Sequence, residues 1–235
     1  MKKIGFGPLK VSIYYFLFGV VWVLFSDKIL YSLTEDKSLI LNYSIIKGSV
    51  FICISSILIF ILVKREITKR IKVWEFYATH DAMTKCLNRR AGLERLTYII
   101  KSKYGKIPIS IIYADLNNLK MINDNFGHSE GDKAIINISK IFRSCIRRDD
   151  FVVRLGGDEF LIVVLNSDES YATDIVNRIN SKIEELNKLN KIELSVSFGI
   201  ATYSKQYQSI SDFIQEADRR MYEDKKKFHS ELRYA

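Results

Sequence analysis

The chain has 235 residues, a net charge of +9 and a hydrophobic fraction of 48%, with most of the hydrophobic excess before Val63. Its composition, with two prolines and no low-complexity stretch, excludes a disordered chain. The positive charge leaves three kinds of partner open: nucleic acid, an anionic membrane surface or a phosphate-rich ligand. Cys53, Cys86 and Cys145 are widely separated and show no metal-binding spacing, so we predict free thiols.

Two apolar runs, at residues 9–30 and about 43–63, each approach the ~20 residues that a helix needs to cross a bilayer. A short polar link at residues 34–37 separates them, which predicts a two-span hairpin over residues 1–63. A cleaved signal peptide is the alternative for the first run, but no small-residue cleavage pattern follows it. The predicted orientation, with both termini in the cytoplasm, rests on basic residues that flank the hairpin on its inner side. These are Lys2, Lys3, Lys10, Lys64, Arg65, Lys69, Arg70 and Lys72.

Two features of this region leave alternatives open. Lys47 lies near the outer end of the second run, where it either marks the membrane edge or contacts a ligand. Residues 64–78 read as a charged juxtamembrane signalling helix with an apolar stripe at helical spacing. The stripe, formed by Ile67, Ile71, Trp74 and Tyr77, either pairs two chains as a short coiled coil or packs on its own domain.

From residue 79 onward the pattern is that of a mixed α/β domain with a central sheet and flanking helices. Strands are predicted at residues 107–114, 151–155, 160–165 and 193–203. Helices are predicted at residues 133–146, 172–186 and 210–221. The second and third strands are separated by Gly156 and Gly157, which indicates a hairpin.

The hairpin carries the residues with the clearest chemistry. Its glycines let a ligand approach the backbone, and Asp158 and Glu159 follow directly. Asp115 stands at the end of the first predicted strand, so it converges with Asp158 if that strand lies beside the hairpin. Magnesium prefers carboxylate and phosphate oxygens, and two such ions suit attack on a nucleoside triphosphate. For this turn alone, an ordinary exposed loop is the alternative.

The segment Arg-Leu-Gly-Gly-Asp-Glu-Phe at residues 154–160 resembles the signature of the GGDEF family of diguanylate cyclases. Further blocks resemble other family motifs in the same order, at residues 81–90 (DxLT…NRR), 115–132 (DxDxFKxxND…GHxxGD), 195–201 (VSxGxA) and 217–225 (AD…LYxAK). The resemblance covers roughly residues 79–229. It implies an α+β, palm-type nucleotidyl cyclase domain over residues 79–235, with a mostly antiparallel sheet.

The resemblance also implies roles for individual residues. Metal ligands for Mg²⁺ or Mn²⁺ would be Asp115, Asp158, Glu159 and the backbone carbonyl of Leu116. Asp158 and Glu159 would form the catalytic centre, with Glu159 as a further ligand or as the base for the ribose hydroxyl. Substrate would be bound by Asn123, Asp132, Lys120, Gly156, Gly157 and Lys225. Of these, Asn123 and Asp132 would read guanine, whose adjacent N–H donors suit a carboxylate.

A product site is implied upstream of the glycines. In the family, an RxxD motif five residues before GGDEF forms an inhibitory site, and Arg147 and Asp150 occupy that position. Arg178 falls where the family often has a second arginine for the same ligand. Arginine forks suit phosphate and guanine edges. The alternative is a polar helix end whose basic residues need no ligand.

The chain departs from the family pattern at several positions. Asn117 replaces the second acidic residue of DxD, Leu119 replaces a phenylalanine, and Lys85 and Cys86 replace Gly and Leu. The closing GRN is replaced by residues 228–230, Phe-His-Ser. The arginine that often touches a phosphate is therefore missing, and we expect this to affect the catalytic rate more than the binding of GTP.

The resemblance predicts a diguanylate cyclase that condenses two GTP into cyclic di-GMP and pyrophosphate. It would act as a homodimer in the inner membrane of a bacterium, with control by the membrane region and by the product. The alternative is a catalytically weak domain that senses GTP or cyclic di-GMP, which the missing arginine favours. We expect no nucleic-acid partner, because the sequence has no basic helix or aromatic platform motif.

Overall fold

The computed structural model describes residues 7–33, 37–102, 108–204, 207 and 209–234. The chain divides into two compact units, Met1–Phe76 and Tyr77–Ala235, and each is described by itself. The polar link at residues 34–36 and the basic residues Lys2 and Lys3 lie outside the described residues.

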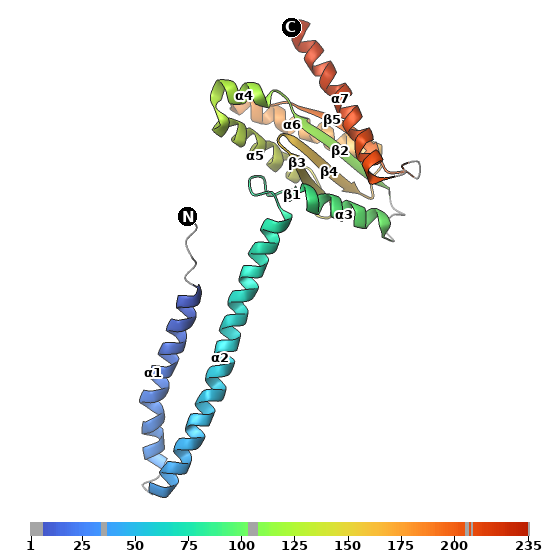
Figure 1. The fold of residues 1–235 in the computed structure, drawn as a ribbon. Helices are drawn as coiled ribbons and strands as arrows, with labels where there is room; N and C mark the ends of the chain where they lie inside the picture. The colour runs from blue at the N-terminus through green and yellow to red at the C-terminus, as the bar shows by residue number, and fades with distance from the viewer. Residues whose placement is uncertain (1–6, 34–36, 103–107, 205–206, 208, 235) are drawn as a thin grey trace. The chain divides into compact units, whose positions relative to one another are not determined.

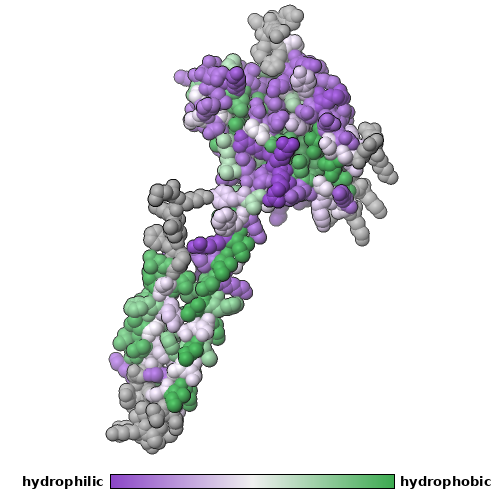
Figure 2. Space-filling model, viewed as in Figure 1, coloured by the Kyte–Doolittle hydropathy of each residue, from purple (hydrophilic) through white to green (hydrophobic). Residues whose placement is uncertain are grey.

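The first unit is a pair of helices, α1 (Gly7–Leu33) and α2 (Lys37–Thr79), which run side by side in Figure 1. Both contain stretches long and apolar enough to cross a membrane. An aromatic cluster of Phe18, Trp22 and Phe51 joins the two helices, with ring centroids 5.5–6.2 Å apart. Hydrophobic residues cover much of the hairpin surface, whereas hydrophilic residues dominate the second unit (Figure 2).

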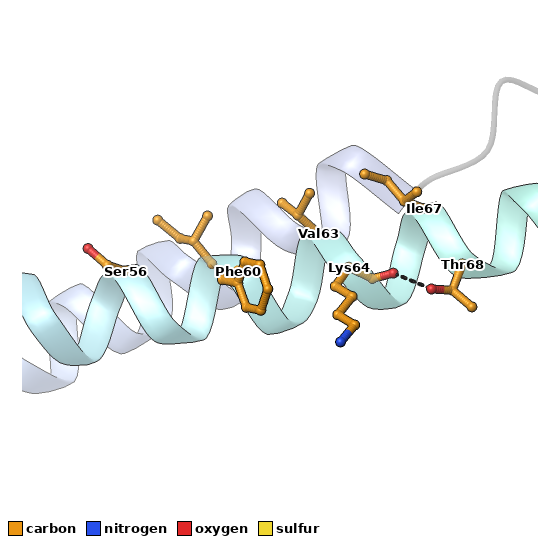
Figure 3. A pocket seen from close by; sticks show the side chains of 7 residues that line it. Ser56, Phe60, Val63, Lys64, Ile67 and Thr68 are labelled. Carbon is orange, nitrogen blue, oxygen red and sulfur yellow. Dashed lines mark hydrogen bonds between the residues drawn. The ribbon is translucent and has the colours of Figure 1, made fainter.

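Helix α2 passes from apolar to charged residues without a break, because its backbone hydrogen bonds continue through the transition. Figure 3 shows this stretch, in which Phe60, Val63 and Ile67 precede or alternate with Lys64 and Thr68. The Thr68 hydroxyl donates to the Lys64 carbonyl at 2.8 Å. The predicted apolar stripe is exposed, since Ile67, Ile71 and Trp74 keep 51%, 49% and 74% of their surface.

The second unit contains a five-stranded sheet in the order β1-β3-β4-β2-β5. Its strands are β1 (Leu87–Asn88), β2 (Ile109–Leu116), β3 (Phe151–Gly156), β4 (Glu159–Leu165) and β5 (Val196–Thr202). Only the β1–β3 pair is parallel; β4 pairs antiparallel with β3 and β2, and β5 with β2. This mixed, mostly antiparallel sheet with flanking helices confirms the predicted fold class.

Helices cover both faces of the sheet (Figure 1), and they are α3 (Arg89–Lys101), α4 (Leu119–Phe126), α5 (His128–Ser144), α6 (Glu169–Leu189) and α7 (Ile210–Tyr234). One core cluster joins Ile112 and Ile162 of the sheet to α4, α5 and α6. The other joins Ile111 and Leu161 to α3 and α7. Every residue of β2 is buried because this strand lies between both helix layers.

Several boundaries differ from those predicted. Strand β2 continues through Asp115 and Leu116, because its pairing with β5 extends to Leu116. Strand β5 begins at Val196, three residues after the predicted start at Glu193. Helix α7 continues well past residue 221 to Tyr234, and α3 and α4 were not predicted.

Candidate active site

The acidic residues named from the sequence meet where β2 and β4 run side by side. Asp115 is the antiparallel partner of Glu159, and residues directly opposite each other present their side chains on one face of the sheet. The backbone amide of Leu116 donates to the carbonyl of Asp158 at 3.2 Å. The first predicted strand, β2, therefore lies beside the hairpin. Asp115 at the end of β2 lies next to Asp158 and Glu159 of the hairpin turn.

Asp115 is a buried carboxylate with one cationic partner. It is 7% exposed, and the Nζ atom of Lys225 on α7 lies 2.6 Å from its Oδ1 atom. Burial raises the pKa of Asp115 above its ordinary value, the nearby lysine opposes this shift, and the charge of Asp158 adds to it. Negative charge is therefore concentrated at this position and only partly compensated, which favours a bound cation.

Tyr113 is a buried tyrosine close to the same carboxylates. Burial, together with the negative charges of Glu159 and Asp218, raises the pKa of Tyr113. Tyr113 precedes Asp115 by two residues on β2, so both side chains lie on the face covered by α7. The hydroxyl of Tyr113 therefore stays protonated at neutral pH.

Helix α7 reaches the sheet because β5 carries Gly199. A Cβ atom at this position would collide with the backbone of Ala217 and Met221. The close approach lets Lys225, one turn after Met221, extend to Asp115 at the end of β2. The family resemblance implied that Lys225 binds substrate, and in the structure its side chain contacts the Asp115 carboxylate.

The donor atoms at this end of β2 suit a hard cation. Within the described residues, no group of three or more His, Cys, Asp or Glu side chains is arranged to hold a metal ion. Magnesium does not require such a cage, because it is usually bound by one or two carboxylates together with substrate phosphates. Asp115 and Asp158 supply oxygen ligands of the kind that Mg²⁺ and Mn²⁺ prefer, so the residues fit such an ion.

The Gly156-Gly157 turn leaves open space above its backbone. A Cβ atom at either glycine would have no atom within 4 Å. Gly157 has φ +51°, in the left-handed region that glycine adopts without strain. The β3–β4 register shifts between Arg154 and Gly156, and such irregularities often re-aim backbone beside a ligand site. A phosphate group has room to approach this turn.

Arg154 is hydrogen-bonded to the Gly156-Gly157 turn. Its Nε and Nη2 atoms donate to the Gly157 carbonyl at 3.1 and 2.7 Å. Its Nη1 atom pairs with Asp81 at 3.1 Å, and Asp81 also accepts hydrogen bonds from the backbone and hydroxyl of Thr84 at 2.8 and 2.7 Å. Burial acts to raise the pKa of Asp81, but the hydrogen bonds from Thr84 and Arg154 hold it below its ordinary value. Sequence reasoning missed this pair, although both residues lie in the motifs that it named.

The residues predicted to read guanine lie on two neighbouring helices, Asn123 on α4 and Asp132 on α5. The side chain of Asn123 packs directly against Gly131, where a Cβ atom would collide with Asn123 Oδ1. Asp132 follows Gly131 and is exposed. Lys120, also exposed, lies in the first turn of α4. The amide of Asn123 and the carboxylate of Asp132 are therefore presented from adjacent helices.

Asn117 stands where the family has a second acidic residue, and its side chain is hydrogen-bonded to two serines. Its side chain donates to the Ser195 hydroxyl at 2.8 Å and accepts from the Ser197 hydroxyl at 3.0 Å. It is 3% exposed. These contacts fasten the end of β2 to the start of β5, next to Asp115 and Leu116.

Two of the residues predicted for the product site, Arg147 and Asp150, lie in the segment just before β3. The third, Arg178, lies on α6. Asp150 is 6% exposed, and its two carboxylate oxygens accept from the backbone amides of Arg147 and Leu165, each at 3.0 Å. The guanidinium of Arg147 stacks on the ring of Tyr171, 4.1 Å from its centroid. Arg178 is exposed on α6. Asp150 thus holds local backbone in this structure, while the two arginines face solvent.

Comparison with known families identifies the second unit. A family model described as "Diguanylate cyclase, GGDEF domain" matches residues 78–230. The chain belongs to the GGDEF domain family.

Named relatives share the GGDEF domain and little else of their length. Diguanylate cyclase A of Treponema denticola is 33% identical over 136 residues, which cover 57% of this chain and 37% of the relative. Diguanylate cyclase DgcP of Escherichia coli is 33% identical over 150 residues, which cover 62% of this chain and 44% of the relative. The chain therefore spans less than half the length of these curated relatives.

A solved structure supports the fold of the GGDEF domain. It describes a novel interaction mode between a microbial GGDEF domain and bis-(3,5)-cyclic di-GMP. This chain matches it with a TM-score of 0.56 and 32% identity, covering 65% of this chain and 93% of the other. The likeness spans nearly all of that domain, so the palm-type fold of the family extends to this chain.

Proposed function

We propose that this protein is a diguanylate cyclase that condenses two GTP molecules into cyclic di-GMP and releases two pyrophosphates. The observation that carries the proposal is the meeting of Asp115, Asp158 and Glu159 beside an open Gly-Gly turn, in a domain of the GGDEF family. The identity to two named diguanylate cyclases supports it.

In this proposal Asp115, Asp158 and the Leu116 carbonyl hold Mg²⁺, or Mn²⁺, with the triphosphate. The ion would supply positive charge that polarises the phosphate and stabilises the leaving pyrophosphate. Glu159 lies opposite Asp115, where it accepts the proton of the ribose 3′-hydroxyl or completes the ligand set. Lys225 keeps the Asp115 carboxylate in place and, with Lys120, provides positive charge for the phosphates.

Guanine recognition falls to α4 and α5. Asp132 accepts both N–H donors of the Watson–Crick edge, and Asn123 offers a donor and an acceptor beside it. Adenine lacks this donor pair and would leave the carboxylate unsatisfied, which makes its binding costly. The site therefore selects GTP over ATP.

The reaction requires two chains. Each domain binds one GTP, and the 3′-oxygen of each attacks the α-phosphorus of the other, forming one P–O bond and breaking the bond to pyrophosphate. Two attacks close the ring of cyclic di-GMP. The exposed stripe of Ile67, Ile71 and Trp74 suits pairing of two α2 helices, so we propose a homodimer.

We also propose that the hairpin anchors the enzyme in the bacterial inner membrane with both termini in the cytoplasm. The two apolar helices support this location. Basic residues at 64–72 follow the second span, as expected on the cytoplasmic side. GTP is a cytoplasmic substrate, which agrees with this orientation of the domain.

Product inhibition at Arg147 and Arg178 belongs to the same proposal. Arg147 is pre-oriented by its stacking on Tyr171, and a guanidinium fork suits a phosphodiester. Asp150 would have to release at least one backbone amide before it bound guanine, because both its oxygens are engaged. Arg147 therefore contributes more to product binding than Asp150 does.

The first test is product analysis of the full-length protein in detergent with GTP and Mg²⁺, by mass spectrometry. We expect cyclic di-GMP from the native chain and at least about a hundredfold less from Asp158→Ala, since a catalytic metal ligand is removed. Asp174→Ala, an exposed position on α6, is the matched control and should retain turnover. Undiminished product from Asp158→Ala would contradict the proposed metal site.

The second candidate function is a sensor of GTP or cyclic di-GMP without turnover. It is favoured by one observation, the Phe-His-Ser segment at residues 228–230 in place of the closing arginine motif. The same experiment separates the two functions. Nucleotide binding without any product would establish the sensor.

A further inference from the structure

A small cavity opens between α1 and α2 at the end of the hairpin where α1 begins. It has a volume of about 200 Å³. Lys10, Val11 and Tyr14 line it from α1, and Leu62, Arg65 and Lys69 line it from α2, together with Glu66. The cavity lies wholly within the first unit, far along the chain from the residues of the proposed active site.

The cavity carries uncompensated positive charge. Three of its side chains are cationic, namely Lys10, Arg65 and Lys69. Its one carboxylate, Glu66, pairs instead with Arg70 at 3.5 Å, and Arg70 does not line the cavity. Among the described residues, none of the three cations has a hydrogen bond or ion pair. An anion would therefore find three available cationic partners here.

The cavity also stands at a boundary between apolar and charged surface. The apolar stretch of α1 begins at Leu9, and the apolar run of α2 ends at Val63, next to the Lys64 shown in Figure 3. On the apolar side, Ile13 and Phe60 keep 47% and 65% of their surface exposed. A ligand with an anionic head and hydrocarbon chains matches both surfaces at once.

We propose that this cavity binds the phosphate headgroup of an anionic phospholipid, with the acyl chains lying along the apolar surface of the hairpin. Arg65 offers a planar fork to the phosphodiester, and Lys10 and Lys69 add point charges from the two helices. Basic pockets between membrane helices on the cytoplasmic side suit such headgroups. The bound lipid bridges α1 and α2. This inference rests on the proposed membrane attachment.

Free phosphate would use the same cations, but the apolar members of the lining favour a lipid. Leu62 and Val11 are half-buried walls of the cavity, and Tyr14 adds an amphipathic ring. Inorganic phosphate gains nothing from these groups, whereas acyl chains do. The two sources can therefore be separated by direct competition.

The test is native mass spectrometry of the full-length chain released from neutral detergent after exposure to equal amounts of phosphatidylglycerol and phosphatidylcholine. We expect a preference for phosphatidylglycerol that falls roughly tenfold in the triple variant, because each basic residue near a membrane surface contributes to anionic lipid binding. The variant is Lys10→Gln, Arg65→Gln and Lys69→Gln. The control removes the same charge from exposed lysines of the second unit, with Lys101→Gln, Lys140→Gln and Lys188→Gln.

The outcomes separate this site from the proposed function. A preference that survives in the Lys10, Arg65 and Lys69 variant, or falls equally in the control, would overturn the site while leaving membrane attachment intact. Displacement of phosphatidylglycerol by millimolar inorganic phosphate would assign the cavity to free phosphate and also overturn it. A chain that stays in solution without membranes or detergent would overturn both the lipid site and the proposed membrane attachment. Circular dichroism of the variant checks that its helices persist.

Discussion

At the residue scale, the site depends on pairs that lie far apart in the sequence. Lys225 reaches Asp115 across 110 positions, and Arg154 reaches Asp81 across 73. In each pair one member stands beside the proposed reaction centre and the other holds it in place. Gly131 has the same function for Asn123, because only a residue without a side chain leaves room for the amide.

The Asp81–Arg154 pair predicts a pH-dependent contribution to stability. The pKa of Asp81 is held below its ordinary value of 3.8, so its ionised form stabilises the folded state above that pH, and the stabilisation is lost as pH falls through the lower folded value. We expect Asp81→Asn to reduce the free energy of unfolding by about 1–2 kcal/mol at pH 7. Chemical denaturation at pH 7 and below pH 3.8 measures the difference, which should shrink at low pH. An equal difference at both pH values would mean that the charge is not responsible.

Gly131 predicts a change in substrate binding. Gly131→Ala would push the Asn123 side chain away from its place on α4, and the loss of one polar contact to guanine would raise KM for GTP by roughly tenfold. Steady-state kinetics with GTP, and ATP as competitor, measures it. Lys140→Ala, exposed further along α5, should leave KM unchanged. An unaltered KM in Gly131→Ala would remove Asn123 from the guanine site.

At the element scale, α2 and α7 each connect the active-site region to another part of the fold. Gly199 lets α7 lie directly on β5, and Arg220 fastens it by bonds of 2.8 Å to the Ile200 carbonyl and to Glu169. Helix α2 ends at Thr79, immediately before the Asp81–Thr84 turn that contacts Arg154. The end of α2 is therefore linked to the glycine turn through one arginine.

The exposed stripe of α2 predicts that two chains pair through this helix. Ile67→Glu with Ile71→Glu would place charges in the proposed contact and should lower both dimer content and turnover, because each active centre needs two domains. Light scattering in detergent reports the dimer. Lys101→Gln with Lys140→Gln lowers the net charge by the same amount at exposed positions of the second unit and should have little effect. A double variant that remains dimeric would place the dimer contact elsewhere.

For the whole molecule, the two-chain reaction makes activity depend on protein concentration. Dilution of the detergent-solubilised chain should lower turnover per chain, since dissociation separates the two half-sites. Cyclic di-GMP formation measured over a hundredfold range of protein concentration tests this. Constant turnover per chain throughout the range would mean either a very tight dimer or a reaction within one chain, and chemical cross-linking at the lowest concentration separates those two cases.

Local patterns in the sequence determined the apolar helices, the alternation of strands and helices, the Gly-Gly turn and the family. Hydrophobic period and turn residues are local properties, so the chain displays them without its fold. They could not determine that β2 extends through Asp115, because that extension comes from pairing with β5. Nor could they determine that Lys225 contacts Asp115, that Arg154 donates to the Gly157 carbonyl, or that Asp150 accepts hydrogen bonds from backbone amides. Those contacts depend on strand register and on how closely a helix approaches the sheet, and only the tertiary structure decides both.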